Sequence, residues 1–128
     1  MNRERGLQSA FIRTLNMLHE CMAVSYYSGA IFDPRAKVFR RRSKNDDRPP
    51  GFPDIVGVYR GRAFAIEVKT DTGVLSSDQK RMHELMRRRG WPVAVCRTVG
   101  EVLLFINGLG VAEKPLNVCA NGSTPTPL

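Results

Sequence analysis

Residues 51–69 read GFPDIVGVYRGRAFAIEVK, and this stretch decides the fold. It contains two runs of β-branched and aromatic residues, Asp54–Tyr59 and Arg62–Lys69, which are typical of β-strands. Between them, Arg60-Gly61 has the length and composition of a tight hairpin loop. We therefore predict an antiparallel hairpin in which Asp54 faces Glu67.

The facing pair Asp54 and Glu67 indicates a metal site. Directly opposed residues in a hairpin have Cβ atoms about 4.5–5.5 Å apart, so two carboxylates there repel each other. A divalent cation between them reverses the sign of that interaction, because hard cations such as Mg²⁺ prefer carboxylate oxygens. Strand alternation places Lys69 on the same face as Glu67. The expectation depends on the loop, because a three-residue loop or a bulge would offset Asp54 from Glu67.

Before the hairpin, amphipathic periodicity predicts a first helix from about residue 4 to residue 24. Its apolar residues recur three or four positions apart: Leu7, Phe11, Leu15, Leu18 and Met22. Residues 25–53 are rich in proline, glycine and serine and are predicted to be mostly irregular. One short strand is expected within them, at Ala36–Arg40.

After the hairpin, a second helix is predicted from Ser76 to about Arg89. Ser76 and Gln79 have the spacing of a capping box, and Gly90 ends the helix. A short buried strand, Val93–Arg97, and a last helix over residues 99–107 follow.

The predicted order is helix, strand, strand, strand, helix, strand, helix. The two hairpin strands are antiparallel, and the helical crossover makes the third and fourth strands parallel. This is an α/β fold with a small mixed sheet flanked by helices. Residues 1–110 form the expected domain, and residues 111–128, with three prolines and little apolar periodicity, form an expected flexible tail.

Two further polar residues lie on core-facing positions of the predicted helices. Glu4 is centred on the apolar stripe of the first helix, whereas Glu20 points away from it. A buried carboxylate needs a partner, although a solvated first turn would also suit Glu4. Gln79 leans toward the core side of the second helix. A metal site built from His19 and His83 is not expected, because no acidic residue has ligand spacing from them.

The charge of the chain points to a polyanionic partner, most simply nucleic acid. Twenty Lys and Arg residues against twelve Asp and Glu residues give a net charge of +8 and a pI near 10.0. Seven basic residues lie between Arg35 and Arg48, and we expect this run to contact phosphates, chiefly through Arg40, Arg41, Arg42 and Lys44. Lys80 belongs to a basic face of the second helix, which is either solvated or a second phosphate track.

Length and composition exclude several protein classes. At 128 residues the chain is one domain, and its 42% hydrophobic content excludes a disordered or collagen-like chain. No apolar run is long enough to span a membrane, and the first residues lack the pattern of a secretory signal. Three widely spaced cysteines, Cys21, Cys96 and Cys119, argue against a disulfide framework and for a reducing compartment.

Three motifs together resemble a known enzyme superfamily. Gly51-x-Pro53-Asp54, Glu67-x-Lys69 and Ser76/Ser77-x-Gln79 resemble the PD-(D/E)XK nucleases, and most closely the VRR-NUC (virus-type replication-repair nuclease) domain. The resemblance covers residues 4–107 and implies a restriction-endonuclease-like core. It further implies a Mg²⁺- or Mn²⁺-dependent phosphodiesterase acting on DNA. The implied metal ligands are Asp54, Glu67, the Val68 carbonyl and Glu4, and the implied catalytic residues also include Lys69, which positions water, and Gln79.

The same resemblance implies a homodimer that cuts branched DNA such as Holliday junctions, and a phage or mobile-element protein that acts in a bacterial cytoplasm. Three alternatives stay open at this point. The chain could be a restriction- or flap-type nuclease on the same fold, an RNA-processing enzyme, or a non-catalytic nucleic-acid-binding module. Against the last, a pure binding protein gains nothing from opposing two carboxylates.

Overall fold

The structure is a computed structural model that describes residues 3–25, 31–33, 35, 38–40 and 47–110. Its central sheet has the strand order β1-β4-β5-β6, with bounds β1 Cys21–Ser25, β4 Ile55–Tyr59, β5 Arg62–Val68 and β6 Val93–Cys96. A separate two-stranded sheet contains β2 Ile31–Asp33 and β3 Val38–Arg40. The helices are α1 Arg3–Met17, α2 Ser77–Arg88 and α3 Val99–Leu109.

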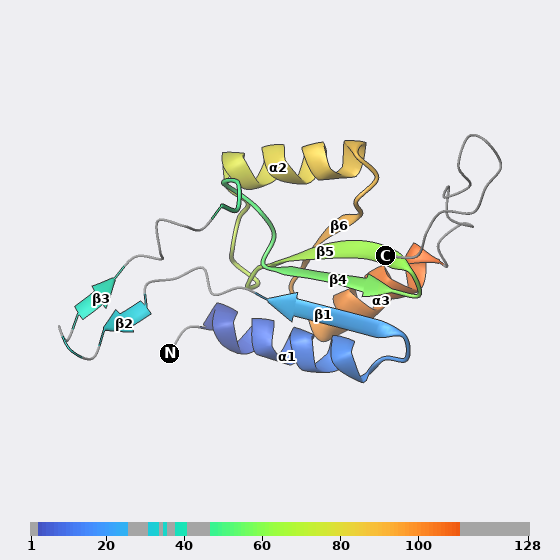
Figure 1. Ribbon diagram of the computed structural model, residues 1–128, viewed down its shortest axis with the longest axis horizontal. Coiled ribbons are helices and arrows are strands. Elements are labelled where there is room, and N and C mark those ends of the chain that lie inside the picture. Colours follow the sequence, from blue (N-terminus) through green and yellow to red (C-terminus); the bar gives the residue numbers. More distant parts are fainter. Residues whose placement is uncertain (1–2, 26–30, 34, 36–37, 41–46, 111–128) are drawn as a thin grey trace, which may run out of the picture.

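Helices cover both faces of the central sheet. Figure 1 shows α2 alone on one side and α1 and α3 on the other. The larger part of the core lies on the α1 and α3 side, where Phe11, Phe64 and Ile106 are buried. A smaller cluster under α2 contains Ala65 and Met86. None of these helices is long and apolar enough to cross a membrane.

The central hairpin forms in the predicted register. β4 and β5 are antiparallel, with Ile55 opposite Ile66 and Tyr59 opposite Arg62. Arg60 and Gly61 have φ angles of 49° and 83°. Two consecutive positive φ angles are typical of the type I′ turn, whose twist matches that of the strands it joins.

The crossover through α2 is also confirmed. β5 and β6 are parallel over Ala65–Val68 and Val93–Cys96, with α2 between them in the chain. The capping box of Ser76 and Gln79 is present at the start of α2, and Gly90 follows the helix with a φ angle of 82°. The sheet is therefore mixed and flanked by helices, as predicted.

The predicted first helix is seven residues too long. α1 ends at Met17, and the chain then forms the edge strand β1, which pairs antiparallel with β4. In β1 only Ala23 is buried, while Met22 is 72% exposed instead of lying on an apolar helix stripe. The Asn16 side chain fixes the change of direction, because it exchanges hydrogen bonds of 2.8 and 3.1 Å with the backbone of Ala23.

The strand predicted at Ala36–Arg40 is observed as β3, Val38–Arg40, but it pairs with β2 and not with the central sheet. The first strand of the main sheet is β1 instead. The predicted order of helices and strands thus holds for the main sheet, with its first strand assigned to the wrong residues. The expected tail, residues 111–128, lies outside the described residues.

Candidate active site

The two acidic residues predicted to face each other lie at one end of the central sheet. Asp54 directly precedes β4, and Glu67 is the next-to-last residue of β5. The register that pairs Ile55 with Ile66 places them opposite each other. Both are buried, since Asp54 is 7% exposed and Glu67 is 1% exposed. Two adjacent carboxyl groups in such a position need a proton or a cation to hold them together.

Without a cation, a proton holds the pair together. Asp54 Oδ2 accepts a hydrogen bond of 2.9 Å from the Val68 backbone N–H, and the Asp54 carboxyl is also hydrogen-bonded to Glu67. Burial, this bond to Glu67 and the Glu67 charge raise the pKa of Asp54 to about 8. Burial raises the pKa of Glu67 as well, while the Asp54 bond and the Lys69 charge lower it. At neutral pH, Asp54 therefore carries the proton and Glu67 accepts it.

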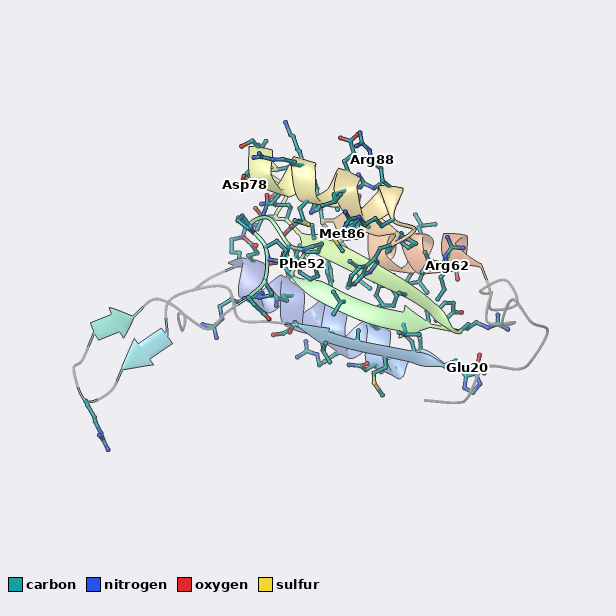
Figure 2. The ribbon with its side chains drawn as sticks, turned by 45° about the horizontal axis from the view of Figure 1, so that its top comes forward. Glu20, Phe52, Arg62, Asp78, Met86 and Arg88 are labelled. Carbon is teal, nitrogen blue, oxygen red and sulfur yellow. The ribbon has the colours of Figure 1, made fainter. Side chains whose placement is uncertain are left out.

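Glu4 and Lys69 approach the same pair. Burial and the Asp54 charge raise the pKa of Glu4, and the Lys69 charge lowers it. The N-terminus of α1 thus brings a third carboxyl group to this end of the sheet. Glu20 lies elsewhere, beside the β4–β5 turn, where it pairs with Arg60 at 3.3 Å. Figure 2 shows Glu20 far from Asp78, which lies in the first turn of α2.

The donor set fits a hard divalent cation such as Mg²⁺ or Mn²⁺. Asp54 and Glu67 supply carboxylate oxygens that face each other, and a divalent cation between them would relieve their repulsion. Within the described residues, no group of three aspartate, glutamate, histidine or cysteine side chains is placed so that it could hold a metal ion, which leaves the two-carboxylate pair as the candidate. An open site of this kind suits Mg²⁺, which keeps several waters and binds through one or two carboxylates plus substrate phosphate.

At Gly51, the backbone of the loop that carries Asp54 packs closely against the backbone at the start of α2. Its φ angle is 82°, a conformation that favours glycine. A Cβ atom at Gly51 would lie 2.3 Å from the Asp78 backbone oxygen and 2.7 Å from the Gln79 backbone nitrogen. The glycine of the Gly51-x-Pro53-Asp54 motif is thus required by a close approach between two backbones.

We expect Gly51→Ala to destabilise the protein by about 2–4 kcal/mol, because a strained φ angle and a backbone collision add together. Gly90→Ala is a matched control, since Gly90 has the same φ angle of 82° but no atom within 4 Å of the added Cβ. Its expected cost is about 1 kcal/mol. Urea unfolding of both variants measures the difference, and equal costs would contradict the role assigned to the close approach.

The Gln79 side chain is used in the capping box. Its Oε1 accepts a hydrogen bond of 2.9 Å from the Ser76 N–H, and the Gln79 backbone N–H donates to Ser76 Oγ at 3.1 Å. These bonds order the first turn of α2 next to Gly51. The structure therefore gives Gln79 a structural task, and the catalytic role implied by the resemblance stays a prediction.

His83 is a site residue that the sequence analysis missed. It lies on the inner face of α2, is 1% exposed, and its Nε2 is 3.1 Å from Glu67 Oε1. Burial and the nearby Arg87 charge lower the pKa of His83, which favours the neutral ring. The available signal was its position between Met82 and Met86, where a polar residue on a core-facing helix stripe requires a partner.

Comparison with known proteins assigns this arrangement to a family. A family model for the VRR-NUC domain matches residues 2–100. The chain belongs to the VRR-NUC domain family. A solved VRR_NUC domain is 24% identical with a TM-score of 0.57, and the match covers 84% of this chain and 97% of that one. A solved VRR_NUC domain protein is 20% identical with a TM-score of 0.55, covering 84% and 90%. No curated protein matches the chain.

Membership in the VRR-NUC family confirms the predicted resemblance and makes the chain a nuclease-family domain. The likeness to the two solved structures supports the predicted fold class, a mixed sheet flanked by helices in a restriction-endonuclease-like arrangement. The roles of individual site residues still rest on their geometry in this chain.

A cavity of about 490 Å³ adjoins this end of the VRR-NUC domain. It lies between α1 and the loop after β5, and its lining includes Arg3, Leu7, Thr70 and Arg97. Arg97 also fixes that loop, since its guanidinium donates hydrogen bonds to the backbone oxygens of Thr70 and Gly73. The loop that begins directly after Lys69 is therefore braced against β6.

The predicted nucleic-acid contacts lie only partly within the described residues. Lys80 is exposed on α2. Arg40 is the last residue of β3, and only its backbone is described. Arg41, Arg42 and Lys44 lie outside the described residues. The assignment of this basic run to phosphate binding stays a prediction.

Proposed function

We propose that this VRR-NUC domain is a metal-dependent, structure-selective DNA endonuclease. The observation that carries the proposal is the buried pair Asp54 and Glu67, opposite each other across the hairpin, with the Lys69 charge acting on both. A purely structural hairpin has no use for two opposed carboxyl groups at 7% and 1% exposure.

Each site residue has a task in phosphodiester hydrolysis. Asp54 and Glu67, with the Val68 carbonyl and Glu4, would hold Mg²⁺ or Mn²⁺. Such an ion supplies a Lewis acid and lowers the pKa of a bound water. The Lys69 ammonium positions the attacking water and stabilises negative charge that develops around phosphorus. The Val68 N–H orients the Asp54 carboxyl through the 2.9 Å hydrogen bond.

DNA is the proposed substrate because the chain is strongly basic overall although its candidate site is acidic. The net charge of +8 attracts a polyanion, and the paired carboxyl groups are confined to the buried end of the sheet. Two of the residues that line the neighbouring cavity, Arg3 and Arg97, add positive charge close to the loop that begins after Lys69. Lys80 on α2 offers a further exposed charge.

Branched DNA, such as a Holliday junction, is the proposed preferred substrate, and a homodimer is the proposed active form. Both follow from the resemblance of a single-domain chain to junction-cutting members of the family. Cutting two strands symmetrically requires two sites related by a two-fold axis, which a homodimer provides. A cytoplasmic location in bacteria, or in a phage-infected cell, fits this activity.

The test is cleavage of a labelled four-way junction, its linear duplex and a splayed arm, each with Mg²⁺, Mn²⁺ or EDTA. We expect cutting only with a metal ion, preference for the junction, and no cutting by Lys69→Ala. Preference for the linear duplex or the splayed arm would instead assign a restriction- or flap-type nuclease. Tight binding without cutting of any substrate would instead indicate that the chain is a non-catalytic nucleic-acid-binding module.

The basic run gives a separate prediction about binding. We expect replacement of Arg40, Arg41 and Arg42 by Ala to weaken DNA binding and flatten its salt dependence, by a slope of roughly 0.9 for each phosphate that the run neutralises. Arg60→Ala is the control, because Arg60 lies in the turn at the other end of the sheet. Fluorescence anisotropy over a salt series measures the slope. An unchanged slope in the triple variant would show that the run does not touch phosphate.

A further inference from the structure

Glu67 and His83 form a contact that no solvent reaches. Both side chains are 1% exposed, and 3.1 Å separates Glu67 Oε1 from His83 Nε2. Glu67 points from β5 toward α2, on the same side of the strand as Ala65, which packs against Met86. His83 comes from the inner face of α2. Apart from this contact, the layer between α2 and the sheet is largely apolar, as Phe52 and Met86 in Figure 2 illustrate.

The hydrogen bond has a defined direction. As a metal ligand Glu67 is an ionised carboxylate, which has only acceptor oxygens, so it is the acceptor toward His83 Nε2. His83 Nε2 then carries a proton and donates it to Glu67 Oε1. The other ring nitrogen, Nδ1, is buried and has no hydrogen-bond partner among the described residues.

A buried Nδ1 without a partner among the described residues does not favour histidine at position 83 on packing grounds. A buried acceptor without a partner is destabilising, and an apolar side chain of similar size would pack against Met86 without that penalty. What an apolar residue cannot do is donate to Glu67. The histidine is therefore explained by its effect on the Glu67 carboxylate.

We propose that His83 is the residue that positions Glu67 for cation binding. By holding Oε1, it fixes the rotation of the carboxylate so that Oε2 is directed to the cation shared with Asp54. The inference rests on the proposed function, in which Glu67 is a metal ligand. Hydrogen-bonded partners of ligating carboxylates typically affect metal affinity or activity roughly 10–100-fold when they are replaced.

The test compares two amide replacements of His83, by Gln and by Asn, in the full chain. The Gln amide nitrogen is at the same bond distance from the backbone as His Nε2, whereas the Asn amide nitrogen corresponds to Nδ1. We expect His83→Gln to bind Mn²⁺ within about threefold of wild type and His83→Asn to bind it roughly 10–100-fold more weakly. Loss of the free Mn²⁺ signal in electron paramagnetic resonance measures binding without reference to cleavage.

His83→Met adds the apolar case. We expect the metal-free Met variant to melt no lower than wild type, and its Mn²⁺ affinity to fall as in the Asn variant. Cleavage by His83→Asn and His83→Met, the two variants expected to bind Mn²⁺ weakly, should recover in part at high Mn²⁺ concentration. Wild-type Mn²⁺ affinity in folded His83→Asn or His83→Met would overturn the role of His83 alone. Absence of Mn²⁺ binding by the wild type would overturn the proposed function and this inference together.

Discussion

Asp54→Asn and Glu67→Gln should each abolish cleavage while leaving the fold intact. Loss of a metal ligand removes several kcal/mol of transition-state stabilisation, and each 1.4 kcal/mol is about tenfold in rate, so we expect a fall of roughly 1,000-fold or more. DNA binding measured without a metal ion should be unchanged, because the proton-sharing wild-type pair and each variant carry one negative charge at neutral pH.

The fold should survive because the amide copies the protonated acid. In the metal-free protein Asp54 accepts from the Val68 N–H and donates to Glu67. An Asn side chain can do both through its oxygen and its amino group. Likewise, Gln at position 67 can accept from His83 and donate to Asp54. Glu84→Gln is the matched control, since Glu84 is an exposed acid on α2 that pairs with Arg88.

The measurement is single-turnover cleavage beside anisotropy binding and melting temperature. Equal loss of cleavage and binding in Asp54→Asn, or a similar loss in Glu84→Gln, would count against the site.

A second matched pair of variants tests whether Glu4 takes part in metal binding. Glu4→Gln should raise the metal concentration needed for cleavage. Glu20→Gln should not, because Glu20 pairs with Arg60 at the other end of the sheet.

The parts of the fold that the sequence predicts correctly are those with local determinants. The β4–β5 hairpin depends on Arg60-Gly61, and its register alone places Asp54 opposite Glu67. The limits of α2 depend on Ser76, Gln79 and Gly90, which act within a few residues of the helix ends. In each case the signal lies in the segment that it shapes.

The error at β1 has a different cause. Leu18 and Met22 are four residues apart, which continues the helical period, but residues 21–25 form a strand in which only Ala23 is buried. What decides between helix and strand is pairing with β4, whose residues lie thirty or more positions later in the chain. The turn itself uses Glu20 at a φ angle of 57°, without the glycine that usually announces such a turn.

The site residues also differ in whether local sequence or contact between distant segments determines their position. Asp54, Glu67 and Lys69 follow from strand register, but the task of His83 exists only because α2 packs across β5. In the sequence analysis the two histidines, His19 and His83, are considered only as metal ligands, and no such site is expected. His83 receives no other role there. Its actual partner is a carboxylate on another element, which no spacing within α2 indicates.

The metal-free protein should lose stability as pH rises toward 8. The pKa of Asp54 is about 8 in the folded state and about 3.8 when unfolded, so folding takes up a proton between these values. Stability falls with pH wherever the folded state holds the extra proton. Between pH 6.5 and pH 8.0 the expected loss is about 1–2 kcal/mol, since each pKa unit corresponds to about 1.4 kcal/mol.

His83 and Cys96 also have shifted pKa values, but neither shift opposes stability in the way that the Asp54 shift does within this pH window. His83 has the opposite effect, because its lowered pKa makes the folded state release a proton, but that contribution is complete above its ordinary value of 6.5. The raised thiol pKa of Cys96, about 12, acts only as pH approaches the ordinary thiol value of 9.0. Asp54→Asn should therefore flatten the profile, and Asp78→Asn, a surface control paired with Arg81, should not.

A divalent cation should reverse the trend, because it replaces the shared proton between Asp54 and Glu67. Mg²⁺ must compete with that proton, so its stabilising effect should be small at pH 6.5 and largest at pH 8.0. Urea unfolding at both pH values, with EDTA or excess Mg²⁺, measures the four stabilities. If Mg²⁺ stabilises wild type and Asp54→Asn equally, or by the same amount at both pH values, the cation does not bind where the proton is held.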